Sequence, residues 1–335
     1  MKSVIMIGGF WNIRGLNKSG RLDCISDFIS YNNLDFVCLC ETKKEHFTTA
    51  LKSINRNFNW QWMPAKGTAG GILFGIKNMA ANIISCQYKE FCLSIMLKNS
   101  TDDMLWRLIV IYGSPYEEGK QRFIDEIHNM LESWNGPTLI GGDFNIAMFQ
   151  YEKNNEIINQ RWANALNNWI NFWGLLEYKS PERTYTWCNN QDQPIIANLD
   201  KIFCNTELEN AYPLASVKSA SRAGSDHVPL IFNFGVHEVF KPKLFRFENW
   251  WLEREEFHEL VFKTWSTPCR ESDTIEVWQY KIRMLRKKIR GCARNVDAEI
   301  RKNKQALLRE YDMLDVFQED HSLAEREKER MKEVI

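Results

Sequence analysis

The sequence lacks three features that would assign it to familiar classes of protein. None of its nine cysteines forms a C-x-x-C pair, so a paired-cysteine metal site is not indicated. No apolar run approaches the ~20 residues that cross a bilayer, and no signal peptide is evident. Scattered thiols without a secretion signal are typical of a reducing compartment. We therefore expect an intracellular protein that has no membrane partner.

The sequence also has no excess of charge of either sign, with 43 Lys and Arg residues against 43 Asp and Glu residues. Net charge therefore indicates no partner, and a preference for nucleic acid would have to come from local clusters. The 335 residues are rich in apolar material, since 44% are hydrophobic, including 13 Trp and 20 Phe. This is enough for one large core and for additional chain beyond it.

The segment from Thr138 to Asn145 reads Thr-Leu-Ile-Gly-Gly-Asp-Phe-Asn. It predicts a short buried strand that stops abruptly and presents Asp143 and Asn145 at its end. Phe144 would point to the opposite side, as the strand period of two requires. Two glycines before an aspartate also occur in ordinary turns, so this segment alone is compatible with either a turn or a functional site.

Strand and helix patterns alternate along residues 1–236. Runs of β-branched, aromatic and apolar residues predict strands at 4–7, 36–40, 72–76, 91–97, 105–112, 183–187, 199–203 and 228–232. Helical spacing predicts a helix that Ser19 would cap, a second at 117–134, and a third at 161–173 that Gly174 would end. Because strands outnumber helices, we predict an α/β (α+β) fold with sheets inside and helices outside.

The character of the chain changes near residue 236. The sequence Lys241-Pro242-Lys243 breaks the pattern, and an aromatic cluster follows at 245–251. From Thr274 the chain contains no proline, and apolar residues from Ile275 to Val296 step by three and four, which predicts a helix with a heptad seam. We assign 1–236 to one domain and 237–335 to a helical, partly basic tail. This tail would either pack on the protein or touch nucleic acid or a partner.

Polar side chains suited to metal and phosphate chemistry lie at the ends of the predicted strands. Metal-assisted phosphodiester cleavage needs a carboxylate for a hard cation, a group that activates water and an oriented histidine. Each residue alone has an ordinary explanation as a cap, an ion pair or a turn, but the set predicts one site. The set comprises Asn12, Glu41, Tyr112, Asp143, Asn145, Asp200, Asp226 and His227.

The order of the motifs resembles that of the endonuclease/exonuclease/phosphatase (DNase I-like) superfamily, and most closely the endonuclease domain of plant LINE-type non-LTR retrotransposons. The motifs are WNIRGLN at 11–17, CETK at 40–43, AGGIL at 69–73, GGDFN at 141–145, YTW at 185–187, LDK at 199–201 and SDH at 225–227. The aromatic segment at 245–251 is similar to the connection toward a reverse transcriptase. The resemblance implies a four-layered α/β sandwich of two packed mixed β-sheets flanked by helices, with the site at one edge.

The resemblance implies metal and water roles for five residues. Glu41 would bind a divalent metal, with Asn12 helping to hold the metal or the phosphate and Asp226 as a second carboxylate nearby. The implied metal is Mg²⁺, with Mn²⁺ as an alternative. Asp143 would align or deprotonate the attacking water, and Asn145 would orient both Asp143 and the phosphate.

The resemblance also implies contacts to the substrate. His227, fixed by Asp200, would hydrogen-bond the phosphate oxygen as charge grows there, and Tyr112 would contact the scissile phosphate. Thr186 and Ser225 would lie on the rim that faces DNA. Basic residues near the motifs favour DNA as the substrate; they are Lys43, Lys44, Lys66, Arg183, Lys201 and Arg222.

Two positions depart from the pattern of the relatives. Arg14 stands where some relatives carry an acidic residue, which removes one metal carboxylate and puts a two-metal mechanism in doubt. Lys201 stands where Arg is usual, so the charge is kept but a bidentate fork is lost.

The leading hypothesis is a nuclear, Mg²⁺-dependent DNA endonuclease that nicks one strand and leaves a 3′-hydroxyl, as in target-primed retrotransposition. A reverse transcriptase or another helical partner would bind the tail. A second hypothesis keeps the fold but has a phosphoinositide or sphingomyelin headgroup as substrate. A third is a catalytically silent retroelement relic that acts only through its helical tail.

Overall fold

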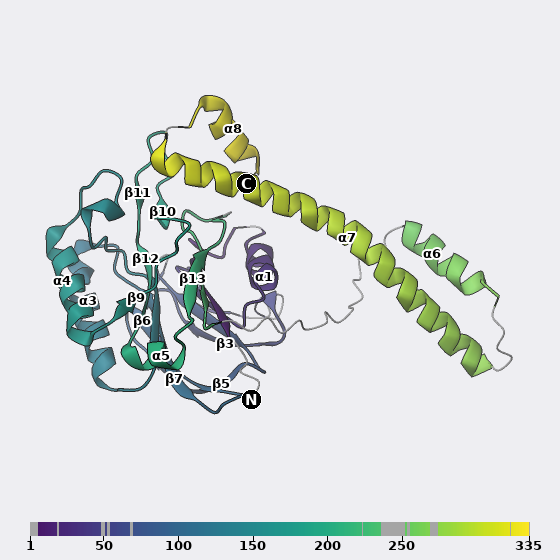
Figure 1. The fold of residues 1–335 in the computed structure, drawn as a ribbon, viewed down its shortest axis with the longest axis horizontal. Coiled ribbons are helices and arrows are strands. Elements are labelled where there is room, and N and C mark those ends of the chain that lie inside the picture. Colours follow the sequence, from purple (N-terminus) through teal and green to yellow (C-terminus); the bar gives the residue numbers. More distant parts are fainter. Residues whose placement is uncertain are drawn as a thin grey trace. The chain divides into compact units, whose positions relative to one another are not determined.

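The computed structural model describes residues 6–235 apart from 19, 48–50, 52–53, 68–69 and 223, together with 252, 255–268, 274–321 and 323–334. The chain divides into two compact units, one of Met1–His237 with Tyr311–Ile335 and one of Glu238–Glu310. The first unit contains all of the described strands (Figure 1).

The first sheet is built around one parallel pair of strands. Its strand order is β13-β14-β1-β2-β4-β3, with β1 parallel to β2 and the other neighbours antiparallel. The strands are β1 (Ile7–Asn12), β2 (Phe36–Cys40), β3 (Phe58–Met63), β4 (Ile72–Lys77), β13 (Ser216–Ser219) and β14 (Leu230–Asn233).

The second sheet repeats this plan, with β7 parallel to β8 and the other neighbours antiparallel. Its order is β5-β6-β7-β8-β12-β9. The strands are β5 (Ala81–Tyr88), β6 (Cys92–Asn99), β7 (Leu105–Tyr112), β8 (Thr138–Asp143), β9 (Leu176–Glu177) and β12 (Asp200–Cys204). A separate short hairpin pairs β10 (Trp187–Cys188) with β11 (Ile196–Ala197).

Each parallel pair is connected by a crossover helix. Helix α1 (Arg21–Tyr31) connects β1 to β2, and α3 (Glu117–Glu132) connects β7 to β8. A parallel pair needs such a crossover, and it places the carboxyl ends of both strands at the same edge of the sheet. This region also contains the 3₁₀ turn η1 (Gln150–Glu152), α4 (Gln160–Trp173) and α5 (Thr206–Ala211).

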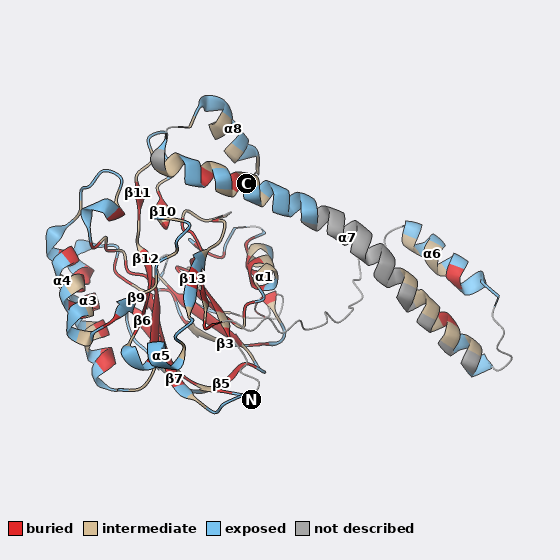
Figure 2. Ribbon diagram, in the orientation of Figure 1, coloured by how far each residue is buried: buried red, intermediate tan, exposed pale blue. Residues whose placement is uncertain are grey.

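Three buried clusters separate four layers. Phe36, Phe74 and Trp106 belong to the cluster between the two sheets. A second cluster joins the second sheet to α3 and α4, and a third joins the first sheet to α1. Figure 2 shows the buried residues concentrated on the strands. The predicted four-layered α/β sandwich with two mixed sheets is confirmed.

Of the strand predicted at 4–7, residues 4 and 5 lie outside the described residues, and of the other two only Ile7 lies in a strand. Strand β1 starts at Ile7 and continues through Gly8 and Gly9, which a sequence reading takes as a loop; residues 1–5 lie outside the described residues. The glycines are required by packing, because a Cβ on Gly8 would come within 1.9 Å of the Phe36 ring.

The accuracy of the other predictions of strands depends on the position of the strand in its sheet. Strands β2 and β7 have the predicted bounds, and α3 and α4 begin and end within two residues of theirs. Strands β3, β5 and β13 were not predicted, and all three are edge strands, whose apolar pattern is weak. Of the strand predicted at 183–187, only Trp187 lies in a strand. Helix α1 begins after Gly20, and the expected cap Ser19 lies outside the described residues.

The predicted helical tail is also confirmed. It comprises α6 (Glu255–Ser266), α7 (Thr274–Asp320) and α8 (Glu325–Val334). Ile275 and Trp278 of the predicted seam are exposed, whereas the side chains of 291–300 and the aromatic segment 245–251 lie outside the description. No helix among the described residues is long and apolar enough to cross a membrane.

The end of α7 belongs to the first unit and is held there by buried ion pairs. Asp315 accepts from Arg183 Nη1 at 2.6 Å and from Arg222 Nε at 2.8 Å, and Asp312 accepts from Arg183 Nη2 at 2.5 Å. The side chains of Arg183, Arg222 and Asp315 are each at most 4% exposed.

Candidate functional site

The predicted site residues converge at the edge where the two parallel pairs end. Asn12 is the last residue of β1, Glu41 follows β2, Tyr112 ends β7 and Asp143 ends β8. The antiparallel strand β12 places Asp200 directly opposite Asp143. His227 precedes β14, which pairs with β1, and its carbonyl accepts from Trp11 Nε1 at 3.0 Å.

Left-handed backbone conformations are concentrated at this edge. Four of the eight described non-glycine residues with positive φ lie here: Arg14, Glu41, Lys43 and Asn145. Backbone of this kind costs free energy and often accompanies functional sites. The Gly70–Gly71 turn supports the loop at Glu41, because its carbonyls accept from the backbone N–H groups of Thr42 and Lys43.

Asn12 joins the two halves of the site. Its Nδ2 donates to Glu41 Oε2 at 3.1 Å and to Asp143 Oδ2 at 2.8 Å. Its Oδ1 accepts from the backbone N–H of Arg14 at 3.1 Å. Asn12 thus bridges two carboxylates through its Nδ2, while its Oδ1, which has two lone pairs, accepts one hydrogen bond.

His227 and Asp200 form a buried pair. His227 Nδ1 lies 2.8 Å from Asp200 Oδ2, and Nε2 lies 3.8 Å from Asp143 Oδ2. Burial lowers the pKa of His227, but the charges of Asp200 and Asp143 outweigh it and raise this pKa to about 9. The two carboxylates therefore favour the protonated ring, in which Nε2 can donate.

Both carboxylate oxygens of Asp143 accept hydrogen bonds within the protein. Its Oδ1 accepts from the backbone N–H of Asn145 at 2.8 Å, and its Oδ2 accepts from Asn145 Nδ2 at 3.2 Å. Burial raises the pKa of Asp143, the positive charge of His227 opposes this, and Asp200 adds to it; the net direction is upward. A buried carboxylate with a raised pKa is suited to accept a proton.

Glu41 and Asp226 form a second carboxylate pair, and Arg14 lies between them. Arg14 Nη1 is 3.3 Å from both oxygens of Glu41, and Arg14 Nε is 3.2 Å from Asp226 Oδ2. Lys43 Nζ is 3.0 Å from Glu41 Oε1. Burial alone would raise the pKa of Glu41, but Lys43 and Arg14 lower it below its ordinary value.

The carboxylates at this edge fit a hard divalent cation, which prefers oxygen ligands. Asp226 Oδ1 is buried and has no hydrogen-bond partner, and Glu41 is the facing carboxylate across Arg14. Asp143, Asp200 and His227 form a second group whose donor atoms lie within 4.8 Å of one another. In that second group Asp200 and His227 are paired with each other at 2.8 Å, whereas Asp226 Oδ1 has no hydrogen-bond partner, so we favour Glu41 and Asp226 as the metal ligands.

The remaining predicted residues support the loops. Thr186 Oγ1 accepts from the backbone N–H groups of Leu199 at 3.0 Å and Asp200 at 2.9 Å. Ser225 Oγ donates to the carbonyl of Asn12 at 2.7 Å. Tyr112 has a raised pKa because it is buried near the charges of Glu41 and Asp143. Thr186 and Ser225, which are predicted on the rim that faces DNA, use their hydroxyls in hydrogen bonds within the protein.

Three of the six basic residues expected to face DNA are engaged elsewhere. Arg222 and Arg183 are buried against Asp315. Lys201 is also buried, with Nζ 2.7 Å from Glu152 Oε1. Their partners lie 49 to 132 residues away in the sequence, so local sequence could not reveal them. The expected rim charge is reduced to Lys43, Lys44 and Lys66, of which Lys66 is exposed.

Two supporting residues were missed by the sequence analysis. Lys120 donates through Nζ to the carbonyls of Ser114 and Asn145, both at 2.9 Å; its position three residues before buried Phe123 on a helix was the available signal. Trp187 Nε1 donates to Asp226 Oδ2 at 3.1 Å. Its motif was noticed, but no residue pattern points an indole at a carboxylate 39 positions away.

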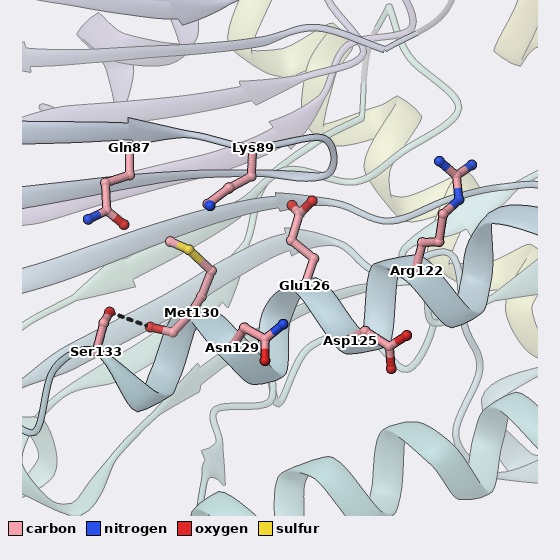
Figure 3. A pocket seen from close by; sticks show the side chains of 8 residues that line it. All are labelled: Gln87, Lys89, Arg122, Asp125, Glu126, Asn129, Met130 and Ser133. Atoms are coloured by element: carbon pink, nitrogen blue, oxygen red, sulfur yellow. Dashed lines mark hydrogen bonds between the residues drawn. The ribbon is translucent and has the colours of Figure 1, made fainter.

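A depression of about 460 Å³ lies on a different part of the second sheet, between β5 and α3. Figure 3 shows its lining, in which Glu126 points from α3 toward the segment of Lys89, which directly follows β5. Glu126 accepts from the backbone N–H groups of Glu90 and Phe91, so it has a structural role. None of the predicted site residues lines this depression.

The sequence of this chain is similar to those of known proteins. The chain is 24% identical over 261 residues to craniofacial development protein 2 of Tragulus javanicus, covering 71% of this chain but 44% of that protein; it thus spans less than half of that relative.

Two solved structures share the fold. A 3′-5′ exonuclease from Neisseria meningitidis superposes with a TM-score of 0.55 at 18% identity, covering 69% of this chain and 100% of that one. The endonuclease domain of TRAS1, a telomere-specific non-LTR retrotransposon, also gives 0.55, at 12% identity and with 69% and 99% coverage. Residues 9–227, which contain the whole cluster, match the sequence family itself, and the chain belongs to the endonuclease/exonuclease/phosphatase family.

Proposed function

We propose that this protein is a metal-dependent phosphodiesterase that nicks one strand of DNA. The observation that carries the proposal is the position of His227, whose Nδ1 lies 2.8 Å from Asp200 and whose Nε2 lies 3.8 Å from the buried carboxylate of Asp143. This arrangement offers a hydrogen-bond donor and a proton acceptor side by side at one edge of the sandwich. The fold shared with the TRAS1 endonuclease domain supports DNA as the substrate.

The roles of the residues follow from their contacts. Asn12 and Asn145 hold the two oxygens of Asp143 in position. Asp143 would align water and accept its proton. His227 would donate from Nε2 to a phosphate oxygen as negative charge grows there. Asp200 fixes the orientation of the ring and stabilises its charge. Tyr112, at the end of β7, is the proposed contact to the scissile phosphate.

Glu41 and Asp226 are the proposed ligands of Mg²⁺, with Mn²⁺ as an alternative ion. When bound, the ion would supply Lewis acidity to the phosphate. Lys43 borders this carboxylate pair and is proposed to contact the DNA backbone. Asn12 is proposed to keep Glu41 and Asp143 at a fixed separation.

The proposal extends to retrotransposition. A nick that leaves a 3′-hydroxyl would prime reverse transcription in the nucleus, as in the plant LINE-type elements that the motifs resemble. The helices after residue 237 would then lead toward a reverse transcriptase or bind a helical partner.

A plasmid-nicking assay tests the chemistry. Supercoiled DNA is incubated with the full chain in Mg²⁺ or in EDTA, and extension by a DNA polymerase detects the 3′-hydroxyl. We expect nicking in Mg²⁺ only, and a loss of about a hundredfold or more in Asp143→Asn and His227→Gln. The control is Asp125→Asn, on the solvent side of α3, which should nick normally.

Three outcomes would overturn parts of this proposal. Absence of nicking by the unchanged protein would favour a silent relic. Equal nicking by Asp143→Asn would remove the assigned site. Phosphate release from a phosphoinositide without nicking of DNA would keep the site and change the substrate class.

A further inference from the structure

Arg14 occupies the position between the two carboxylates that best fit a metal. Its guanidinium contacts Glu41 through Nη1 and Asp226 through Nε, at 3.3 and 3.2 Å. The carboxylate side chains are only 6% and 14% exposed, whereas that of Arg14 is 48% exposed. The guanidinium therefore neutralises a nearly buried pair while its own side chain keeps a path to solvent.

The backbone fixes Arg14 in this position. Its φ is 51°, a left-handed conformation that bulky residues rarely adopt, and its N–H donates to Asn12 Oδ1. Gly15 follows with a φ of 100°. The backbone at Arg14 is thus pre-organised, whereas the side chain is held only by its contacts to Glu41 and Asp226.

While Arg14 stays in place, its charge and that of Lys43 leave the carboxylate pair little attraction for a divalent cation. Glu41 and Asp226 carry two negative charges, and Arg14 with Lys43 carries two positive ones. A divalent ion at Glu41 would meet like charge at close range, an unfavourable arrangement. Asp226 Oδ1 nevertheless stays buried without a partner, so one ligand atom remains available.

We propose that Arg14 is a built-in competitor of the divalent cation for Glu41 and Asp226. Metal binding and the Arg14 contacts exclude each other, so the ion enters as the guanidinium turns toward solvent. This chain accordingly binds its metal more weakly than the same carboxylate pair would without the arginine. The inference rests on the proposed metal-dependent function and adds a determinant of metal affinity to it.

Binding of Mn²⁺ to the metal-free full chain, without DNA, tests this inference. Electron paramagnetic resonance of free Mn²⁺ gives the affinity directly. Arg14→Asn removes the charge with a residue that tolerates positive φ, and Arg14→Gly does so with no steric cost. Arg14→Lys keeps the charge, and Arg122→Gln removes a control arginine that pairs with Glu90 on the surface.

We expect Arg14→Asn and Arg14→Gly to bind Mn²⁺ about tenfold more tightly than the unchanged protein. Arg14→Lys should change the affinity less, and Arg122→Gln should not change it. Without metal, the two neutral variants should unfold at a lower temperature, and added Mn²⁺ should raise that temperature more than in the unchanged protein.

Equal or weaker Mn²⁺ binding by both neutral variants would overturn the role of Arg14. In that case, nicking of DNA in Mg²⁺ by the unchanged protein would leave the proposed function intact, and only the competing role of Arg14 would be lost. Absence of Mn²⁺ binding by every protein, including the unchanged one, would overturn both proposals together. Arg14→Asn and Arg14→Gly differ in how easily they adopt positive φ, so a failure of one variant to fold leaves the other to test the inference.

Discussion

At the scale of single residues, many of the site's polar atoms have assigned partners within the protein. Asn12 links Glu41 to Asp143, and Thr186 holds the backbone at Asp200. Such supporting contacts decide how well the reacting groups are oriented. A sequence motif identifies the residue types, but it does not say whether a hydroxyl faces the substrate or the protein.

Thr186 gives a prediction at this scale. Its hydroxyl oxygen accepts from two backbone N–H groups in a nearly buried position. Thr186→Val keeps the shape and removes the acceptor, so two donors lose their partner. We expect the free energy of unfolding to fall by about 2 kcal/mol or more, with a lower nicking rate because Asp200 is less well held.

Thr186→Ser is the matched control, because it keeps the acceptor and loses one methyl group. Urea unfolding followed by tryptophan fluorescence should place it much closer to the unchanged protein. Equal stability of the Val and Ser variants would contradict a structural role for the hydroxyl.

At the scale of elements, the end of α7 is part of the folded first unit. Asp315 neutralises Arg183 and Arg222, which lie on the loops that also carry Thr186 and Ser225. The sequence pattern assigns 237–335 to a tail. It does not indicate that residues near 315 contact residues near 183 and 222. Ion pairs of this sequence separation leave no periodic signal.

Asp315→Asn tests this contact. It leaves the buried guanidinium of Arg222 without its carboxylate and leaves Arg183 with only Asp312 and Glu319. We expect a loss of about 3–5 kcal/mol in the free energy of unfolding. Asp312→Asn is the comparison, since the Asp312 side chain is 42% exposed and should cost less than about 1 kcal/mol. Similar effects of the two changes would argue against a buried anchor.

The elements that sequence patterns predict well are the buried ones. Strands β2 and β7 carry continuous apolar runs, and α4 has a clear apolar face. The edge strands β3, β5 and β13 alternate less clearly because solvent reaches them. Gly8 and Gly9 misled the prediction, since glycine usually marks a turn, whereas here aromatic rings fill the space above a strand.

At the scale of the whole molecule, the balanced charge and the buried basic residues limit contact with nucleic acid. Lys201, Arg183 and Arg222 are engaged by carboxylates. Lys43, Lys44 and Lys66 remain of the six basic residues that sequence proximity suggested. All six basic residues lie near the motifs in the sequence, but nearness in the sequence does not distinguish a charge on the surface from one in a buried ion pair.

The salt dependence of DNA binding follows from this count. Each phosphate contact contributes about −0.9 to the slope of log K against log salt, so three lysines predict a slope of about −3. Fluorescence anisotropy with a labelled duplex, in Ca²⁺ to prevent cleavage, measures it. Lys66→Gln should make the slope shallower by about 0.9, and a slope near −5 in the unchanged protein would mean that further basic residues contact DNA.

The pairing of the first and the last strand of the first sheet has a consequence for synthesis. Strand β14 lies between β13 and β1, and Trp11 contacts His227 across 216 residues. A nascent chain on the ribosome therefore lacks His227, and with it the complete cluster, until almost all of the sandwich has been translated. The capacity to cut DNA would then arise in one late step, when the newest strand inserts beside the oldest.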